Sequence, residues 1–231
     1  MCKISVVTVN YNNSKGLIKT ILSVIEQDYD DVEFIIVDGG STDGFVDVVE
    51  KYKESINVLI SEKDSGIYDA MNKGINNAKG EWISFMNSGD TFYSSKAISN
   101  VFKKKVPENI NLIYGAQFKL KEIIPPLPAH FLMLGIIHAC HQAMFFRNGI
   151  HYDLRYKIYG DYDLVARLYK QDRKSLLYSN EIVCEFEGGG VSSSVSKEKR
   201  IDKYRAVYNI FGLKSVFASF LYMIALKVGL K

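Results

Sequence analysis

The sequence predicts an α/β fold in which a mostly parallel sheet is flanked by helices. Runs of β-branched residues alternate with amphipathic helical patterns through residues 1–95, and this alternation is typical of βαβ units. A length of 231 residues is enough for one sizeable core. Polar clusters follow the strand-like runs, and in parallel sheets ligands bind beyond the carboxyl ends of the strands. We therefore expect a ligand site along that edge.

The elements of the first half follow one another as strand and helix. Strands are expected at 4–9, 32–37, 56–60 and 82–86, and helices at 17–25, 45–52 and 67–78. The polar clusters that end the strands include residues 10–14, 38–44 and 87–90.

The second half is less regular, so we expect a mixed arrangement there. Residues 112–120 predict one or two strands, 143–147 a short strand and 161–169 a helix. The three glycines at 188–190 predict a flexible loop. From residue 197 onward the pattern is helical, and 216–226 is almost wholly apolar.

The composition is that of an ordinary folded domain. Hydrophobic residues make up 47% and charged residues 24% of the chain. Its three cysteines form no CxxC pair, so we expect a reducing compartment and no disulfide framework. No apolar signal segment is seen at the N-terminus, and this predicts a cytoplasmic protein. No RNA-binding signature accompanies the single tryptophan and the many tyrosines, so no nucleic-acid partner is expected.

Two carboxylates at strand ends are candidates for binding a nucleotide. Asp38 follows four apolar residues and precedes a Gly-Gly turn, where a fixed carboxylate can accept a hydrogen bond from N3–H of a uracil ring. The alternative is that Asp38 or Ser41 only caps the following helix. Asp90, with Asn87 in the same turn, suits Mg²⁺ or Mn²⁺ beside a diphosphate, although Asn-Ser-Gly-Asp is also a plain turn sequence.

Four segments together resemble glycosyltransferase family 2, the inverting enzymes of the GT-A fold. They are residues 5–12 (SVVTVNYN), 34–44 (FIIVDGGSTDG), 64–74 (DSGIYDAMNKG) and 85–90 (FMNSGD). The resemblance implies one GT-A domain over 1–212, with a nucleotide-sugar-binding half at 1–95 and an acceptor half at 96–212.

The resemblance also implies roles for individual residues of these segments. Thr8, Asn10 and Tyr11 would flank the nucleotide, Asp38 would hold the base, and Asp90 would serve the metal and the diphosphate. In the third segment, Asp64, Gly66 and Asn72 would belong to the substrate site.

Two departures from the family pattern affect the metal and the diphosphate. The family block Asp-x-Asp is Asn87-Ser88-Gly89-Asp90 here, so metal binding rests on one carboxylate. Met71 stands where the family often has an arginine, so a cation for the diphosphate would come from Lys73 or Lys63.

The catalytic base is expected in the second half. Inverting transfer needs a carboxylate that takes the proton of the acceptor hydroxyl. Residues 159–164 (YGDYDL) resemble the family's Glu-Asp site with Gly160 in place of the glutamate. This assigns the base to Asp161, with Asp163 as the alternative candidate. A further alternative is that Asp161 only caps its helix and has no catalytic role.

Histidines near residue 140 suggest two different sites. His138, Cys140 and His141 are too closely spaced for a closed tetrahedral zinc set. His141 and Gln142 are instead expected to line the donor-sugar or acceptor pocket, as in similar family members.

The C-terminal segment 213–231 is both apolar and basic. From residue 195 onward the chain has eight basic and two acidic residues, so this part carries a net charge of +6 while the rest carries −3. The uncharged stretch is too short to span a bilayer but suits a helix lying on an anionic membrane surface. A helix packed on the core or a dimer contact is the alternative.

The combined expectation is an enzyme at the inner face of the cell membrane. It would move a hexose from a nucleoside diphosphate sugar, UDP-linked, to a lipid-linked oligosaccharide for capsule, O-antigen or exopolysaccharide. A non-catalytic nucleotide-sugar-binding protein remains an alternative. A sugar nucleotidyltransferase is a weaker one, because residues 10–14 lack a glycine-rich basic phosphate loop.

Overall fold

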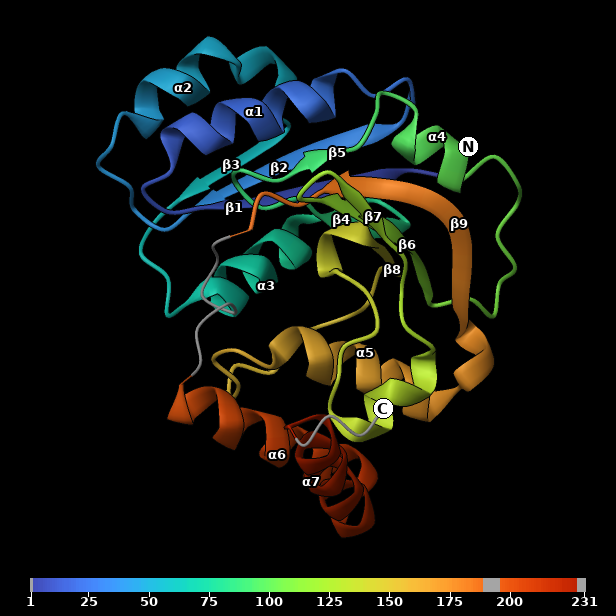
Figure 1. Ribbon diagram of the computed structural model, residues 1–231. Helices are drawn as coiled ribbons and strands as arrows, with labels where there is room; N and C mark the ends of the chain where they lie inside the picture. Colours follow the sequence, from blue (N-terminus) through green and yellow to red (C-terminus); the bar gives the residue numbers. More distant parts are fainter. Residues whose placement is uncertain (1, 189–195, 228–231) are drawn as a thin grey trace.

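One nine-stranded sheet runs through the protein, with helices packed on both of its faces (Figure 1). This computed structural model describes residues 2–188 and 196–227. The strands are β1 (Ile4–Asn10), β2 (Val32–Asp38), β3 (Val58–Ser61), β4 (Trp82–Phe85), β5 (Thr91–Phe92), β6 (Leu112–Lys119), β7 (Glu122–Ile124), β8 (Met144–Arg147) and β9 (Leu176–Glu185). The α-helices are α1 (Ser14–Ile25), α2 (Phe45–Lys51), α3 (Ile67–Asn77), α4 (Ala97–Val101), α5 (Gly160–Gln171), α6 (Lys197–Phe211) and α7 (Leu213–Lys227). Four short 3₁₀ helices are η1 (Lys53–Ser55), η2 (Ala129–Leu134), η3 (His141–Ala143) and η4 (Arg173–Ser175).

The first half of the sheet is parallel, as the βαβ rhythm predicts. Its strand order is β3-β2-β1-β4, and Asn10 of β1 is in register with Asp38 of β2. Consequently the carboxyl ends of β1, β2 and β4 reach one edge of the sheet, where the polar clusters lie.

Beyond β4 the sheet is mixed. β8 pairs antiparallel with β4 and β6, β9 runs parallel to β6, and β5 and β7 add antiparallel edges. The expected strands at 112–120 and 143–147 are confirmed as β6 and β8. The ten-residue strand β9 was not anticipated.

Alternation along the strands fills one core on each face of the sheet. Val7 and Val9 of β1 join the cluster that includes residues of α3, α5 and α6, while Ile4 and Val6 join the cluster under α1 and α2. Helices α5, α6 and α7 of the second half all lie on one face of the sheet, below it in the view of Figure 1.

Helix α7 packs against α6 and η2, through small polar residues. Ser215 and Ser219 are buried, and Ser219 Oγ donates a hydrogen bond to the Leu134 carbonyl at 2.7 Å. No helix in residues 2–188 or 196–227 has both the length and the apolar character needed to cross a bilayer. Of the expected glycine loop at 188–190, residues 189 and 190 lie outside the described residues.

Candidate active site

A cavity of about 1180 Å³ opens at the carboxyl edge of the parallel strands. Its wall combines that edge with the loops and helices of the second half, so both halves of the chain build it. The predicted site residues that line it are Asn10, Tyr11, Asp64, Gly66, Asn87, Asp90, His141, Gln142 and Asp161.

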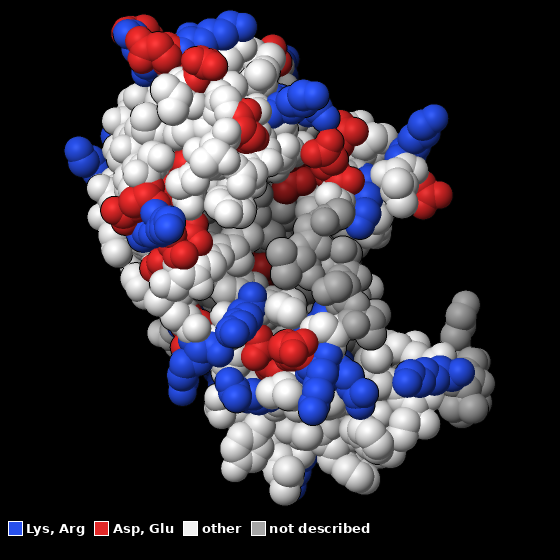
Figure 2. Space-filling view, turned by 90° about the vertical axis from the view of Figure 1, so that its left-hand side faces the viewer, with Lys and Arg blue, Asp and Glu red and all other residues white. Residues whose placement is uncertain are grey.

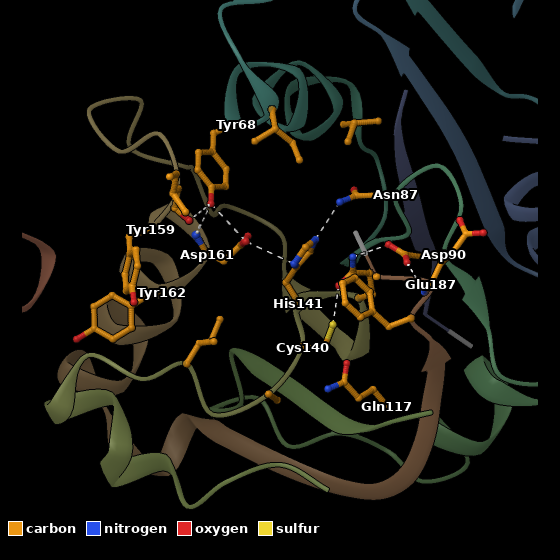
Figure 3. A pocket seen from close by; sticks show the side chains of 18 of the residues that line it. Tyr68, Asn87, Asp90, Gln117, Cys140, His141, Tyr159, Asp161, Tyr162 and Glu187 are labelled. Atoms are coloured by element: carbon orange, nitrogen blue, oxygen red, sulfur yellow. Dashed lines mark hydrogen bonds and ion pairs between the residues drawn. The ribbon is translucent and has the colours of Figure 1, made fainter. Parts of the chain in front are cut away.

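Three polar side chains cross this cavity in a connected row (Figure 3). Asp161 Oδ2 lies 3.4 Å from His141 Nδ1, and His141 Nε2 lies 3.1 Å from Asn87 Nδ2. Because an amide nitrogen only donates, Nε2 accepts, and in the neutral ring the proton sits on Nδ1 toward Asp161. His141 therefore connects the acceptor-half carboxylate to the turn at the end of β4.

Two tyrosines, Tyr152 and Tyr68, surround the carboxylate of Asp161. Tyr152 OH donates to Asp161 Oδ1 at 3.1 Å, while Tyr68 OH donates to the Ile158 carbonyl at 2.7 Å and lies 3.4 Å from Asp161 Oδ2. The two tyrosine rings stack at 5.0 Å. Burial and the neighbouring Asp161 charge raise the pKa of both phenols, so each remains a proton donor at neutral pH.

The structure explains why a glycine, Gly160, precedes Asp161 where the family has a glutamate. A Cβ at this position would lie 2.6 Å from the Tyr68 ring, so any side chain would displace the ring or the start of α5. The tyrosine therefore occupies the space that a side chain at residue 160 would need.

The two candidate bases point to different surroundings. Asp163 is buried, does not line the cavity, and forms an ion pair with Arg167 at 2.8 Å. Burial raises the pKa of Asp163, and the Arg167 charge partly opposes this. Of the two, only Asp161 faces the cavity, which supports the choice made from the sequence.

Asp90 lies on the far side of His141 from Asp161, in a buried network of its own (Figure 3). Its Oδ2 accepts from Gln142 Nε2 at 2.6 Å, and its Oδ1 accepts from the Glu187 amide at 3.0 Å. Burial raises the pKa of Asp90, the two hydrogen bonds lower it, and the Glu187 charge raises it again. A cation bound here would relieve this desolvated carboxylate.

Oxygen atoms suited to a divalent cation gather around Asp90. A Cβ built on Gly89 would lie 2.4 Å from Glu187 Oε2, which places that carboxylate beside the turn. Asn87 Oδ1 is buried and has no hydrogen-bond partner in the described residues. Within these residues no group of three or more His, Cys, Asp or Glu is arranged to hold a metal. The set thus fits a cation that takes further ligands from diphosphate and water.

The cavity holds a concentration of buried polar atoms without partners. Among the described residues, these atoms are Ser84 Oγ, Asn10 Oδ1, Asn87 Oδ1, Gln117 Oε1 and both ring nitrogens of His138. All of these residues except Ser84 line the cavity. Because buried polar groups in proteins are nearly always paired, this pattern indicates a ligand rich in hydroxyl groups or other polar atoms.

Asp38 does not line the cavity in this structure. It is fully buried and accepts five hydrogen bonds, from Asn10 Nδ2, Ser41 Oγ, Ser61 Oγ and the amides of Gly40 and Ser41. Burial by itself would raise the pKa of Asp38, but these bonds together lower it. Asp38 therefore holds Asn10 and the 38–41 turn in place, and its direct contact with a uracil ring stays a prediction.

Three other predicted residues lie outside the cavity lining and have structural partners. Thr8 is buried and donates to the Met86 carbonyl, and Asn72 makes two hydrogen bonds with the backbone of Tyr152. Lys73 Nζ forms an ion pair with Glu62 at 2.8 Å. Each of the three already binds the protein itself, and direct contact of these residues with the substrate stays a prediction.

Several residues that line the cavity or contact its carboxylates were not found from the sequence. Glu187, Tyr68 and Tyr152 touch Asp90 or Asp161, and Lys203 lines the wall formed by α6. The one available signal for Glu187 was its place just before the triple glycine, and recognising it required the missed strand β9.

Comparisons with known proteins agree with this geometry. The family model described as Glycosyl transferase family 2 matches residues 5–123. A PGL/p-HBAD biosynthesis glycosyltransferase of Mycobacterium tuberculosis is 26% identical over 195 residues, covering 75% of this chain and 72% of the relative. The putative teichuronic acid biosynthesis glycosyltransferase TuaG of Bacillus subtilis is 36% identical over 96 residues, covering 40% and 38%.

Solved structures share the fold at low sequence identity. S. aureus TarS in complex with UDP-GlcNAc superposes with a TM-score of 0.69 at 18% identity, covering 95% of this chain and 71% of that one. A Pyrobaculum calidifontis mannosyltransferase in complex with GDP-Man and Mn²⁺ gives 0.65 at 14% identity, covering 97% and 75%. With a GT-A-like α/β fold, a matching family model and a carboxylate that faces a polar cavity, the chain belongs to glycosyl transferase family 2 and is a glycosyltransferase.

Proposed function

We propose that the protein is an inverting glycosyltransferase that moves a hexose from a UDP-sugar to a hydroxyl of a lipid-linked oligosaccharide in cell-surface polysaccharide biosynthesis. The observation that carries this proposal is the position of Asp161. Its carboxylate faces the same cavity as Asn10, Asn87 and Asp90 and is connected to Asn87 through His141. A base on one wall and a nucleotide edge on the other are what a direct displacement needs.

In the proposed reaction Asp161 accepts the proton of the acceptor hydroxyl. The oxygen of that hydroxyl then forms a bond with the anomeric carbon, while the bond from this carbon to the diphosphate oxygen breaks. The nucleoside diphosphate leaves from the opposite face, and the anomeric configuration is inverted. A hydrogen bond from Tyr152 and the contact with His141 hold the Asp161 carboxylate in one orientation, so that little reorganisation is needed when the proton arrives.

The donor end of the cavity is assigned to the parallel edge. Asn10 ends β1 and Tyr11 follows it, while Asp64 and Gly66 precede α3, and all four line the cavity. The N-terminus of a helix favours an anion such as a diphosphate. The TarS fold neighbour was solved with UDP-GlcNAc, which supports a UDP-linked donor here.

We assign Asp90, Asn87 and Glu187 to hold Mg²⁺ or Mn²⁺. When bound, such a cation would neutralise charge on the leaving diphosphate. The raised pKa of Asp90 and the unpartnered Asn87 Oδ1 support this assignment. The mannosyltransferase fold neighbour was solved with Mn²⁺.

The exposed face of α7 supports a membrane-bound acceptor. Leu213, Phe217, Phe220, Leu221 and Ile224 form one stripe at helical spacing, and all are exposed. Lys214 and Lys227 flank the stripe, and Figure 2 shows Lys and Arg gathered in the lower part of the molecule, where Figure 1 places α6 and α7. We therefore place the enzyme at the inner, anionic face of the cell membrane.

The names of the relatives support the acceptor class. One is a PGL/p-HBAD biosynthesis glycosyltransferase, and another is a putative teichuronic acid biosynthesis glycosyltransferase. Together with the apolar stripe on α7, these names favour an acceptor that belongs to the cell surface and is held at the membrane.

A nucleotide-sugar screen tests this function. Thermal shift with UDP-, GDP- and dTDP-hexoses, each with and without Mn²⁺, should identify one stabilising donor. That donor is then incubated with a membrane lipid extract, and release of nucleoside diphosphate is measured. Binding without any release would favour the non-catalytic alternative, and release of pyrophosphate from a sugar phosphate and nucleoside triphosphate would favour a nucleotidyltransferase.

A further inference from the structure

Lys203 is a buried lysine in the wall of the active-site cavity. It lies in the middle of α6, its relative exposure is 8%, and it lines the cavity. Its aliphatic stem lies against Gly135, where a Cβ would meet Lys203 Cε at 2.6 Å. Gly135 has φ +72 and so adopts a conformation that also favours glycine. Residue 135 therefore has to be a glycine for the Lys203 stem to fit here.

The ammonium of Lys203 has no anionic partner in the described part of the chain. Neither an ion pair nor a hydrogen bond of Nζ is found there, and the contact that it makes is with the Tyr204 ring, 5.9 Å from the centroid. The neighbouring Asp202 carboxylate is directed elsewhere, since its Oδ2 accepts the amides of Lys157 and Ile158. Burial lowers the pKa of Lys203, and no nearby carboxylate offsets this. A buried charge without a partner is costly, so an anion entering the cavity would be bound strongly.

The surroundings of Lys203 suggest the chemistry of that anion. Lys157 and Lys199 line the same cavity, which adds positive charge to this part of the wall. Apolar residues Ile136, Leu127 and Met223, the last from α7, line it as well. Phosphate oxygens next to an apolar chain would satisfy both features.

The order of groups along the cavity also fits such a ligand. Asp161 lies in the first turn of α5, α6 with Lys203 lies farther from the sheet, and α7 with its exposed apolar stripe packs against α6 (Figure 1). A lipid-linked saccharide presents its groups in the same order, with a sugar hydroxyl, then phosphate, then hydrocarbon.

We propose that Lys203 is an acceptor-binding residue that holds the phosphate or diphosphate joining the acceptor saccharide to its lipid. This inference rests on the proposed function, because it places the phosphate in the acceptor end of the same cavity. On this proposal, Lys203 of α6 makes the enzyme select acceptors that carry a phosphate over neutral acceptors. Lys203 takes no part in the chemical step.

Calorimetry with farnesyl diphosphate on the full chain, in the presence of saturating UDP, tests the proposal. Wild-type protein should bind this probe, and Lys203→Met, which keeps the stem but removes the charge, should weaken binding on the order of ten- to hundred-fold. Lys203→Arg should retain most of the affinity. Lys197→Met, which removes an exposed lysine from the same helix, should have no effect.

Two further probes separate the parts of the ligand. Inorganic pyrophosphate should bind more weakly than farnesyl diphosphate and show the same dependence on Lys203, whereas farnesol should be indifferent to the substitution. Equal affinity of wild type and Lys203→Met for farnesyl diphosphate would overturn the proposal. Equal losses in Lys203→Met and Lys197→Met would do so too, since they would indicate unspecific attraction.

UDP titrations on the same variants keep this test separate from the proposed function. Unchanged UDP affinity in Lys203→Met shows that the variant is folded. If UDP binds wild type and farnesyl diphosphate does not, the phosphate site is wrong while the donor site stands. If no nucleotide binds wild type, the proposed function fails first.

Discussion

Asp161 and His141 come from different elements of the acceptor half, yet Asp161 Oδ2 lies 3.4 Å from His141 Nδ1 inside the cavity. One residue starts α5 and the other opens η3 ahead of β8. The contact forms because β8 adds to the parallel half of the sheet next to β4 and brings His141 over the turn at Asn87. Donor edge and candidate base are thereby fixed relative to each other.

The role of Asp161 as base predicts a specific kinetic effect. Asp161→Asn keeps the shape of the side chain but cannot take a proton, and loss of a general base costs about 10² to 10⁴ in rate. UDP-sugar affinity should hardly change, because the nucleotide is expected at the other end of the cavity. Initial rates and donor calorimetry on the same protein measure both quantities.

Asp163→Asn is the matched control for Asp161→Asn. Asp163 is buried against Arg167, so its substitution should reduce thermal stability and leave turnover per folded molecule close to wild type. If Asp163→Asn abolished transfer while Asp161→Asn remained active, the assignment of the base would be reversed.

Metal binding through the Asp90 turn gives the second prediction. Glu187→Gln removes a negative charge beside the Asp90 turn, so the Mn²⁺ concentration required for half-maximal activity should rise about ten-fold. Glu185→Gln changes an exposed glutamate two residues earlier and serves as the control. Mn²⁺ titrations of activity and of Mn²⁺-dependent thermal shift compare the two. Full activity of wild type in excess chelator would remove the metal from the mechanism.

Buried His138 predicts a measurable dependence of stability on pH. Burial lowers its pKa from 6.5 to about 4, and the ring lies edge-on to Tyr114 at 4.4 Å. Between these two pKa values the unfolded chain binds a proton that the folded protein does not, so this group makes stability fall as pH decreases from 6.5 to 4. At pH 4.5 the contribution amounts to about 2 to 3 kcal/mol relative to neutral pH.

His138→Phe should remove that part of the pH dependence. Chemical denaturation at pH 7 and pH 4.5 gives the change in the free energy of unfolding, and the change should be smaller in the variant than in wild type. His130→Phe alters an exposed histidine and should behave like wild type. An identical pH dependence in all three proteins would show that His138 is protonated in the folded state.

The parallel half of the fold could be predicted because its strands are short, continuous and apolar. Residues 34–37 are four apolar side chains in a row after Glu33, which pairs with Ser5 and Lys3, and this run became part of β2. β9 was missed because Ser179, Asn180 and Glu181 interrupt its pattern. The structure shows why they do: Asn180 has φ +61, and the pairing with β6 shifts register there.

A site residue could be predicted where its sequence neighbours alone identify it. Asp161 could be chosen because the family motif surrounds it, and Asn87 and Asp90 because they end a buried strand. Lys203 and Glu187 depend on how α6 and β9 pack against distant loops, which local pattern does not determine. Asp38 illustrates a third case, since three of its five internal hydrogen bonds come from the adjoining Gly40-Ser41 turn, but the other two come from Ser61 and Asn10 on other strands.

The last prediction concerns the apolar stripe on α7. A helix packed on a core normally turns its apolar side inward, but α7 buries Ser215 and Ser219 and exposes Phe217, Phe220 and Leu221. Transfer of a phenylalanine side chain out of water is favourable by about 1.5 to 3 kcal/mol. Phe217→Ser with Phe220→Ser should therefore weaken binding to phosphatidylglycerol vesicles by at least about ten-fold, measured by co-sedimentation.

Because neither phenylalanine lines the active-site cavity, UDP binding by this double variant should equal that of wild type. Val46→Ser, which removes an exposed apolar residue from α2 at the opposite end of the molecule, should leave vesicle binding intact. Raising the salt concentration should weaken vesicle binding of wild type, since Lys214 and Lys227 flank the stripe. If vesicle binding were unaffected by the double substitution while a wild-type dimer became monomeric in light scattering, the stripe would be a contact between two copies of the chain, and the membrane assignment would be wrong.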